Sequence, residues 1–389
     1  MEQDIVSLFD ISLFIFVAEA VKSLLAKYNL PYIVGEIVAG MLIGPYALGY
    51  LVNSLLGYPL ISLTPYVLFI SEFSVILLIF ASGLEHGVSP IKSGGSLGFL
   101  SATFGALLPF AVAFFAFSAP LGRDSATFLG VAMGATSLAA VVSIIEEEKL
   151  RGSHVDFLLS ASSSDDVIDL VLLSLALTLL GAKSVSLQGV AFRVSELVLM
   201  WVVIFVASVV VVPRVANRIS EKYVEEFPFL LLFGLTLVMV SLGFSSIIAA
   251  FIAGVSLANS SKSEKVKEVS QVLLSVFGSL FFVVTGAEVN LLEVSLQTVE
   301  LSLALTGVAV AFKWLGVFPF AYLKLRNLKL ANLVSVGMVP RGETGLVVAS
   351  LGASLGVLDQ MEFGSTVLMS IFTTLIGAVT FKYLAKGLK

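Results

Sequence analysis

The chain has 389 residues, of which 58% are hydrophobic and only 13% are charged, and its mean hydropathy is +1.05. Soluble domains carry about 25% charged residues, so this composition excludes an ordinary soluble fold. We expect an all-α polytopic membrane protein. The absence of cysteine and the presence of only two histidines exclude disulfides, thiolate metal sites and iron–sulfur chemistry. The net charge of −5 says little, because the distribution of charge matters more than its sum in a membrane protein.

Apolar runs of about 17–23 residues follow one another along the chain, and each is long enough to cross a bilayer as a helix. We predict about thirteen transmembrane helices, at roughly 4–25, 32–51, 66–85, 96–118, 126–146, 157–180, 196–214, 228–243, 245–260, 270–288, 299–322, 331–356 and 362–381. With the N-terminus outside and the C-terminus cytoplasmic, nearly all lysines and arginines of the loops and span ends lie on the cytoplasmic side. The exceptions are Arg123, Lys183 and Arg193. This bias supports the count, since one missed helix would reverse every later loop.

Two pairs of similar segments indicate an internal repeat. EIVAGMLIG (36–44) resembles AFIAGVSLA (250–258), and IFASGLEHG (79–87) resembles FVVTGAEVN (282–290). The members of each pair lie seven spans apart, and an odd separation inverts a segment relative to the membrane. Chance similarity between Gly/Ala-rich helices is the alternative. We predict two inverted six-helix repeats joined by the seventh span, an architecture typical of secondary transporters.

Two spans contain residues that interrupt a helix. The fifth, GVAMGATSLAAVVS (130–143), has glycines and hydroxyl residues, including Thr136 and Ser137, at its centre. The twelfth, VGMVPRGETGLVVAS (336–350), contains Pro340, Arg341, Gly342 and Glu343. Proline removes an amide and glycine tolerates unusual backbone angles. We therefore predict two helices broken within the membrane, which must be buried or line a cavity. A simple proline kink would not explain the two opposite charges.

The sixth span contains two adjacent carboxylates, Asp165 and Asp166. An ionised carboxylate near the bilayer centre costs ~2.5–3.5 kcal/mol on insertion scales, and neighbouring carboxylates repel each other. A proton, a metal cation or a basic side chain relieves this cost, and competition between the first two is sufficient for antiport. Carboxylate and hydroxyl oxygens suit a hard cation such as Na+. The candidate ligands are Asp165, Asp166, Thr136 and Ser137. Lys313, in the middle of the eleventh span, is the candidate basic partner, either for coupling or for structure alone.

Six segments, in order along the chain, resemble the monovalent cation:proton antiporter-2 family, nearest to the NapA-type sodium/proton antiporters. They are NLPYIVGEIVAGMLIGP (29–45), ATS (135–137), DDV (165–167), FFVVTG (281–286), AFKWLG (311–316) and GMVPRGETGLVVA (337–349). The resemblance implies a NapA/NhaA-like antiporter fold with two broken crossing helices, in a homodimer within a prokaryotic plasma membrane. It also implies a core that moves like an elevator. The implied division places dimerisation-domain helices in 1–95 and 228–298, core helices in 96–182 and 299–389, and a linker helix in 183–227.

The resemblance also assigns roles to residues. It implies that Asp165 pairs with Lys313 and that Asp166 is the essential carrier of Na+ and H+. Sodium would bind at Asp166, Asp165 and Thr136 and displace Lys313. Two protons per Na+ (or Li+) would make the exchange electrogenic. We expect no enzymatic activity, no cofactor and no nucleic-acid partner; the expected partners are Na+, H+, the lipid bilayer and a second copy of the chain.

The remaining polar residues admit more than one interpretation. Glu343 is either a further cation ligand or, as we favour, an acid that neutralises helix ends with Arg341 as its counter-charge. Ser164 and Asp169 depart from the family pattern and are possible accessory groups. Asp169 lies on the same helix face as the aspartate pair. Glu36 is expected at the interface between domains or in a cation funnel.

Other functions remain open from the residues alone. A K+/H+ antiporter or K+ efflux protein of the same superfamily would use a similar site, and a sodium-coupled solute symporter of similar fold would need a larger cavity. An intramembrane aspartyl protease needs facing aspartates on different helices, whereas Asp165 and Asp166 are neighbours separated by about 100° around one helix. The sequence therefore favours sodium/proton antiport.

Overall fold

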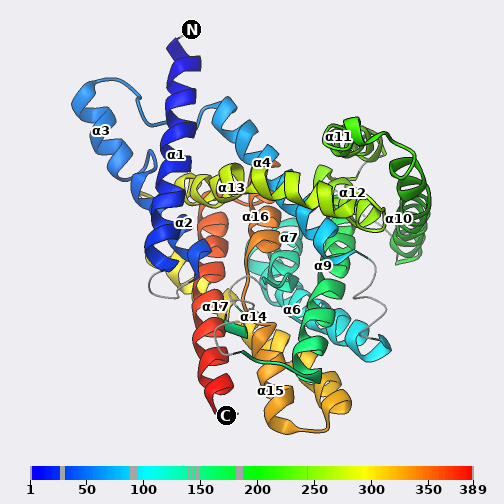
Figure 1. Ribbon diagram of the computed structural model, residues 1–389. Coiled ribbons are helices and arrows are strands. Elements are labelled where there is room, and N and C mark those ends of the chain that lie inside the picture. Colours follow the sequence, from blue (N-terminus) through cyan, green and yellow to red (C-terminus); the bar gives the residue numbers. More distant parts are fainter. Residues whose placement is uncertain are drawn as a thin grey trace.

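The computed structural model describes residues 2–26, 31–87, 95–137, 141, 144–145, 149–180, 187–242 and 244–387. All regular elements within these ranges are helical (Figure 1). They are α1 (Glu2–Ala26), α2 (Tyr32–Ile43), α3 (Leu48–Leu56), α4 (Pro65–His86), α6 (Gly95–Leu121), α7 (Arg123–Gly134), α9 (Ser153–Leu179), α10 (Leu187–Ala216), the 3-10 turn Glu221–Tyr223, α11 (Phe227–Ser241), α12 (Ser246–Ala258), α13 (Ser263–Glu288), α14 (Leu296–Leu325), α15 (Leu328–Gly337), α16 (Glu343–Ser354) and α17 (Gln360–Lys386).

The predicted all-helical chain is confirmed for the described residues. Seven segments are long and apolar enough to cross a membrane by themselves, and the apolar helices α11, α12 and α15 are shorter. Each predicted span overlaps at least one helix of the structure, although the helices of the first, fifth and sixth spans (α1, α7 and α9) are not among these ten segments. Only the first half of the fifth span and scattered residues after it are described. The count of thirteen crossings stays a prediction.

Several boundaries differ from the sequence-based ranges, among them those of α2, of α13 and of α10, which begins at Leu187 instead of 196. The second helix ends at Ile43 instead of continuing to residue 51, because Gly44 and Pro45 interrupt it and proline has no amide to donate. A separate short helix, α3, follows. Helix α13 begins at Ser263, before the apolar run, where Lys267 donates to Glu264 over 3.0 Å within the exposed first turns. Such i,i+3 pairs support helix beyond the apolar segment.

The helices pack as two groups. In the first helix group, α1, α2, α4 and α10–α13 contact one another, and α3 adjoins α2. In the second helix group, α6, α7, α9 and α14–α17 contact one another. Contacts between the groups are sparse and include α9 with α10, α13 with α16 and α2 with α17. In Figure 1 the first group occupies mainly the upper part of the view and the second the lower part.

Glycines allow two helix pairs of the first group to approach backbone to backbone. A Cβ on Gly40 of α2 would clash with the Val283 carbonyl of α13, and one on Gly286 of α13 with the Ile37 carbonyl of α2. The same reciprocal relation joins α4 and α12, through Gly83 and Gly254. These four glycines lie in the four similar segments found in the sequence. The similar segments therefore contact each other crosswise, α2 with α13 and α4 with α12.

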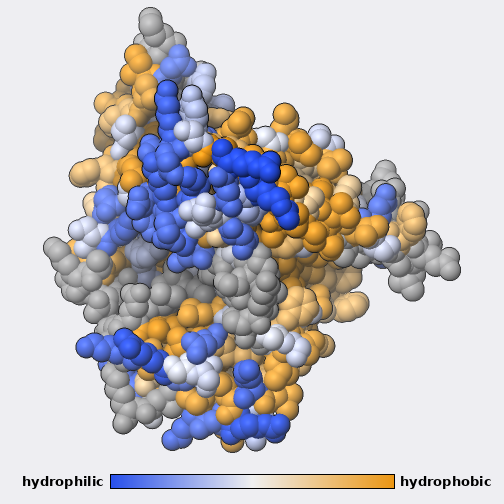
Figure 2. Space-filling view, turned by 45° about the vertical axis from the view of Figure 1, so that its right-hand side comes forward, coloured by the Kyte–Doolittle hydropathy of each residue, from blue (hydrophilic) through white to orange (hydrophobic). Residues whose placement is uncertain are grey.

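Many large apolar side chains face outward in the isolated chain. Phe16, Phe115 and Leu237 are each more than two-thirds exposed. In Figure 2 hydrophilic residues gather in one region of the upper half and at the lower end, and apolar residues cover a broad area on the right-hand side. Exposed apolar surface of this extent is what helices in contact with lipid require.

Replacing Gly254 by alanine should destabilise the protein, because the new Cβ meets the Phe80 carbonyl and α4 and α12 must separate. Overpacking of this kind typically costs about 1–3 kcal/mol. Gly234 in α11 faces open space, and Gly234→Ala should be neutral or slightly stabilising because alanine favours helix over glycine by about 1 kcal/mol. The measurement is the melting temperature of both variants in detergent, which should be lower for Gly254→Ala than for Gly234→Ala. Equal melting temperatures would contradict the close packing of α4 and α12.

Candidate functional site

The two predicted helix interruptions meet inside the second helix group. Helix α7 ends at Gly134 and is followed by non-helical Ala135–Ser137, and residues 338–342 separate α15 from α16. The Ser137 amide donates to the Pro340 carbonyl over 2.9 Å, and Thr136 Oγ1 donates to the Met338 carbonyl over 3.2 Å. Each break thus satisfies backbone groups of the other, which a buried interruption requires.

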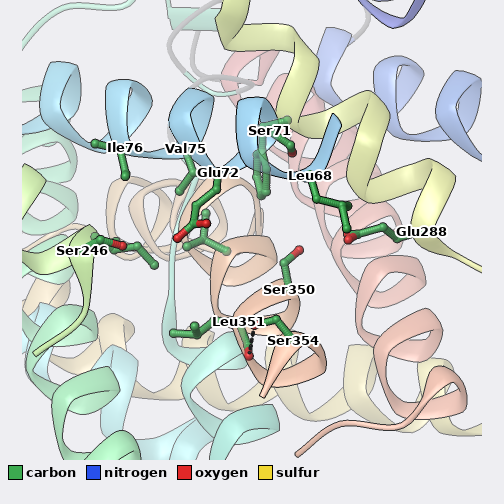
Figure 3. Close-up of a pocket in the computed structure, with 13 residues that line it drawn as sticks. Leu68, Ser71, Glu72, Val75, Ile76, Ser246, Glu288, Ser350, Leu351 and Ser354 are labelled. Carbon is green, nitrogen blue, oxygen red and sulfur yellow. Dashed lines mark hydrogen bonds between the residues drawn. The ribbon is translucent and has the colours of Figure 1, made fainter. Parts of the chain in front are cut away.

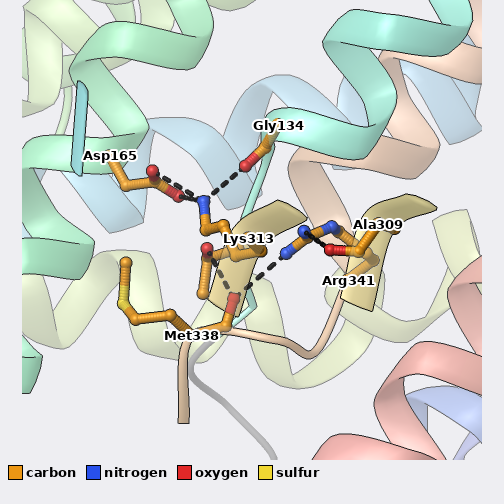
Figure 4. A network of polar contacts seen from close by, with 7 residues as sticks. Gly134, Asp165, Ala309, Lys313, Met338 and Arg341 are labelled. Carbon is orange, nitrogen blue, oxygen red and sulfur yellow. Dashed lines mark hydrogen bonds and ion pairs between the residues drawn. The ribbon is translucent and has the colours of Figure 1, made fainter. Parts of the chain in front are cut away.

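Lys313 and Asp165 form an ion pair at the end of α7 (Figure 4). Lys313 Nζ lies 2.8 Å and 2.7 Å from the two carboxylate oxygens of Asp165, and it also donates to the Gly134 carbonyl over 2.5 Å. Both side chains are 0% exposed. The ammonium therefore compensates a buried carboxylate and the negative, carbonyl end of a broken helix at once.

Arg341 has the corresponding place at the end of α15. Its Nη1 donates to the Met338 carbonyl over 3.1 Å, and its Nη2 donates to the Ala309 carbonyl of α14 over 3.2 Å. The side chain is fully buried, and the Arg341 carbonyl accepts from Ser370 and Thr374 of α17. A second cation therefore lies where helix carbonyls lose their intrahelical partners.

Glu343 is the first residue of α16, the helix that resumes after the break. Its Oε2 accepts a hydrogen bond from Ser137 Oγ over 2.9 Å, which joins the two interrupted segments through side chains. An anion at a helix N-terminus is favourable because the amides there carry partial positive charge. This place fits the helix-end interpretation of Glu343 that we favoured from the sequence.

Asp166 is not part of the Lys313–Asp165 ion pair and lies about 100° from Asp165 around α9. The side chain is half-buried, faces Ser82 of α4 in the first helix group, and is near enough to Glu343 to feel its charge. One aspartate is thus sealed inside the second group, whereas its neighbour lies where the two groups meet.

The other predicted site residues occupy distinct positions. Ser164 Oγ donates to the Ser160 carbonyl of its own helix over 3.0 Å. The Thr136 hydroxyl donates its hydrogen to the Met338 carbonyl. The lone pairs of its oxygen remain able to accept a hydrogen bond or to bind a cation. Glu36 is buried in α2 beside Ser279 of α13, within the first helix group and apart from Lys313. Asp169 is buried next to Gly134.

A cavity of about 190 Å³ lies between the helix groups. Figure 3 shows Glu72 pointing from α4 toward α16, with Glu288 of α13 and Ser350 of α16 also on the cavity wall. Among the residues that the structure describes, no group of three or more His, Asp or Glu side chains could hold a metal ion.

Sequence reasoning missed the backbone acceptors of this site. The Gly134, Met338 and Ala309 carbonyls are available to Lys313 and Arg341 only because of where the helices end and cross. The one signal in the sequence was the coincidence of helix-breaking residues with unpaired basic residues in apolar spans.

Interrupted membrane helices that cross at buried charges define the architecture of a secondary transporter. The family model for the transmembrane sodium/hydrogen exchanger matches residues 12–387. The chain therefore belongs to the sodium/hydrogen exchanger family, whose named relatives are antiporters. The narrower NapA-type assignment stays a prediction.

Individual relatives match over almost their whole length. The Na(+)/H(+)-K(+) antiporter GerN of Bacillus cereus is 29% identical, with 96% of this chain and 95% of the relative covered. A Na(+)/H(+) antiporter of Enterococcus hirae is 27% identical, with 96% of each covered. The solved sodium proton antiporter MjNhaP1 of Methanocaldococcus jannaschii superimposes with a TM-score of 0.77 at 16% identity, covering 100% of this chain and 99% of that one. This structural likeness supports the fold.

Lys313→Met should destabilise the protein by about 3–5 kcal/mol, because it leaves a buried carboxylate without its partner. Adding Asp165→Asn removes that charge, so the double variant should recover most of the loss. Thermal unfolding in detergent of the wild type, the two single variants and the double variant gives a double-mutant cycle, which measures the interaction between the two side chains. Losses that simply add would contradict a direct Lys313–Asp165 interaction.

Proposed function

We propose that this protein exchanges Na+ (or Li+) for H+ across the plasma membrane. The observation that carries the proposal is the sealed Lys313–Asp165 pair next to a half-buried Asp166 at the crossing of two broken helices. Asp166 is the group that Na+ and H+ can both reach. Because one carboxylate cannot hold both, loading with one ion expels the other.

Sodium binding would involve Asp166, Asp165 and Thr136. These groups supply carboxylate and hydroxyl oxygens, which suit a hard cation. Sodium at Asp165 takes the place of Lys313, so the energy of breaking a buried ion pair is coupled to ion binding. We further propose a ratio of two protons per Na+, which makes each cycle move net charge.

We propose that the second helix group carries the ion and moves against the first, as an elevator. The sparse contacts between the groups, and the cavity between them, support this division. The core would comprise 96–182 and 299–389; the dimerisation domain of a homodimer would comprise 1–95 and 228–298, with 183–227 as linker. The crosswise contacts of the four similar glycine segments support two inverted repeats of six helices.

We propose an outside N-terminus and a cytoplasmic C-terminus, on the distribution of basic residues. In that orientation the cavity lined by Glu72 and Glu288 lies on the outer side and would admit cations to the space between the groups. Potassium is a second candidate ion, because one relative bears the name Na(+)/H(+)-K(+) antiporter.

Asp166→Asn should abolish exchange, because the amide neither binds Na+ strongly nor carries a proton. The assay is the dissipation of an imposed pH gradient in proteoliposomes after addition of Na+. Asp156→Asn is the matched control, since it removes an exposed carboxylate from the same helix, and it should exchange at the wild-type rate. Exchange retained by Asp166→Asn would remove Asp166 from the carrier role.

The same vesicles distinguish the ions and the charge movement. With Na+, Li+ and K+ added in turn, Na+ and Li+ should collapse the gradient and K+ should do so weakly or not at all. An imposed membrane potential should change the rate, since two protons per Na+ move charge. A rate independent of voltage would show neutral exchange, and a response to K+ equal to that to Na+ would favour the potassium alternative.

A further inference from the structure

Asp169 is a buried carboxyl that the exchange described so far does not use. Its side chain is 0% exposed, and in the part of the chain that the structure describes neither of its carboxyl oxygens has a hydrogen-bond partner. It follows Asp165 by four residues and Asp166 by three on α9. Residues at these spacings are neighbours on a helix surface, so Asp165 and Asp169 lie one turn apart.

Asp169 and Lys313 approach the same helix end. A Cβ on Gly134 would lie 3.0 Å from Asp169 Oδ1, so the carboxyl packs directly against this glycine. The Gly134 carbonyl is also the backbone acceptor of Lys313 Nζ. Cβ atoms one helical turn apart are about 5–6 Å from each other. A rotation of the long Lys313 side chain can therefore move its ammonium group from the Asp165 carboxylate to the Asp169 carboxyl.

None of the described charged groups around Asp169 donates a hydrogen bond to it. On its own helix it faces Asp165 and Asp166; α14 presents Lys313, and the break before α16 presents Arg341. Lys313 is engaged by Asp165 and the Gly134 carbonyl, and both Nη atoms of Arg341 donate to carbonyls. The Nε of Arg341 has no partner among the described residues and does not bond Asp169. Helix α7 presents the carbonyl end at Gly134, which disfavours an anion, and α6 contains no charged residue. A buried carboxyl in these surroundings holds a proton, because an unpaired charge there is costly.

We propose that Asp169 is the second proton carrier of the exchange, an inference that rests on the proposed sodium/proton antiport. When Na+ takes Asp165, the Lys313 ammonium moves one turn along α9 to Asp169. The Asp169 O–H bond breaks, the proton leaves to water, and the new carboxylate pairs with the ammonium. One Na+ is gained and two protons are lost, one from Asp169 and one from Asp166, so the site becomes more negative by one charge in each exchange. Lys313 remains an ammonium throughout.

The direct test counts the carboxylic acids that ionise when Na+ binds to the purified wild-type protein. Infrared difference spectra should show the loss of two protonated carboxyl bands per bound Na+, one for Asp166 and one for Asp169. Proton release, measured with a pH indicator, should be two per Na+. Loss of a single carboxyl band together with release of two protons would make Lys313 the donor and overturn the proposal.

Variants provide a second readout. Asp169→Asn keeps the size of the side chain and can accept a hydrogen bond from Lys313, but holds no proton. Its proton release should fall from two to one per Na+, and its exchange should become insensitive to voltage. Asp169→Glu should retain two protons. Ser174→Ala is the matched control on α9, because in the described part of the chain the Ser174 hydroxyl bonds back to the Leu170 carbonyl of its own helix and to no other group.

The outcomes separate the two proposals. Release of two protons by Asp169→Asn would overturn the role of Asp169 and leave the exchange intact. An absence of Na+-dependent proton release from the wild-type protein would instead overturn the exchange on which that role rests.

Discussion

The ion pair between Lys313 and Asp165 is the interaction on which the rest of the site depends. It joins α14 to α9 in a fully buried setting and extends to the last carbonyl of α7. Taking two charges out of water is costly, and the cost is recovered only when every remaining donor and acceptor has a partner. Lys313 meets this condition because a broken helix supplies the additional acceptor. The pair is therefore compensated within the protein, and in the proposed exchange a competing cation replaces the lysine.

The two helix breaks form one electrostatic unit. Lys313 and Arg341 lie at the carbonyl ends of α7 and α15, and Glu343 lies at the amide end of α16. Direct bonds between the two non-helical segments fix their relative position. A helix interior could not present backbone carbonyls in this way, so the interruption itself makes the site polar within an apolar protein. The family's exchange of a small cation for a proton requires such a polar site shielded from lipid.

The sequence was informative where the type of a single residue determines the local backbone structure. Pro340 and Gly342 predicted the break between α15 and α16, and Gly134, Thr136 and Ser137 marked the end of α7. The pairing of Lys313 with Asp165 came from the family resemblance, since spacing alone cannot bring residues on α9 and α14 together. The carbonyl groups that accept hydrogen bonds from Lys313 and Arg341 could not be predicted from the sequence. Every residue has a backbone carbonyl, and only the way the helices cross determines which of them lie next to these two side chains. The separate helix α3 was missed, since the apolar run hides the effect of Gly44 and Pro45.

Competition for one buried locus is the central claim, and the dependence of Na+ kinetics on pH tests it most directly. Initial rates should be measured in proteoliposomes over a range of Na+ concentrations at several pH values. If protons and Na+ exclude each other, the apparent KM for Na+ rises as the pH falls, while the maximal rate stays constant. A maximal rate that falls with pH at constant KM would show that protons inhibit from elsewhere, and would contradict the account.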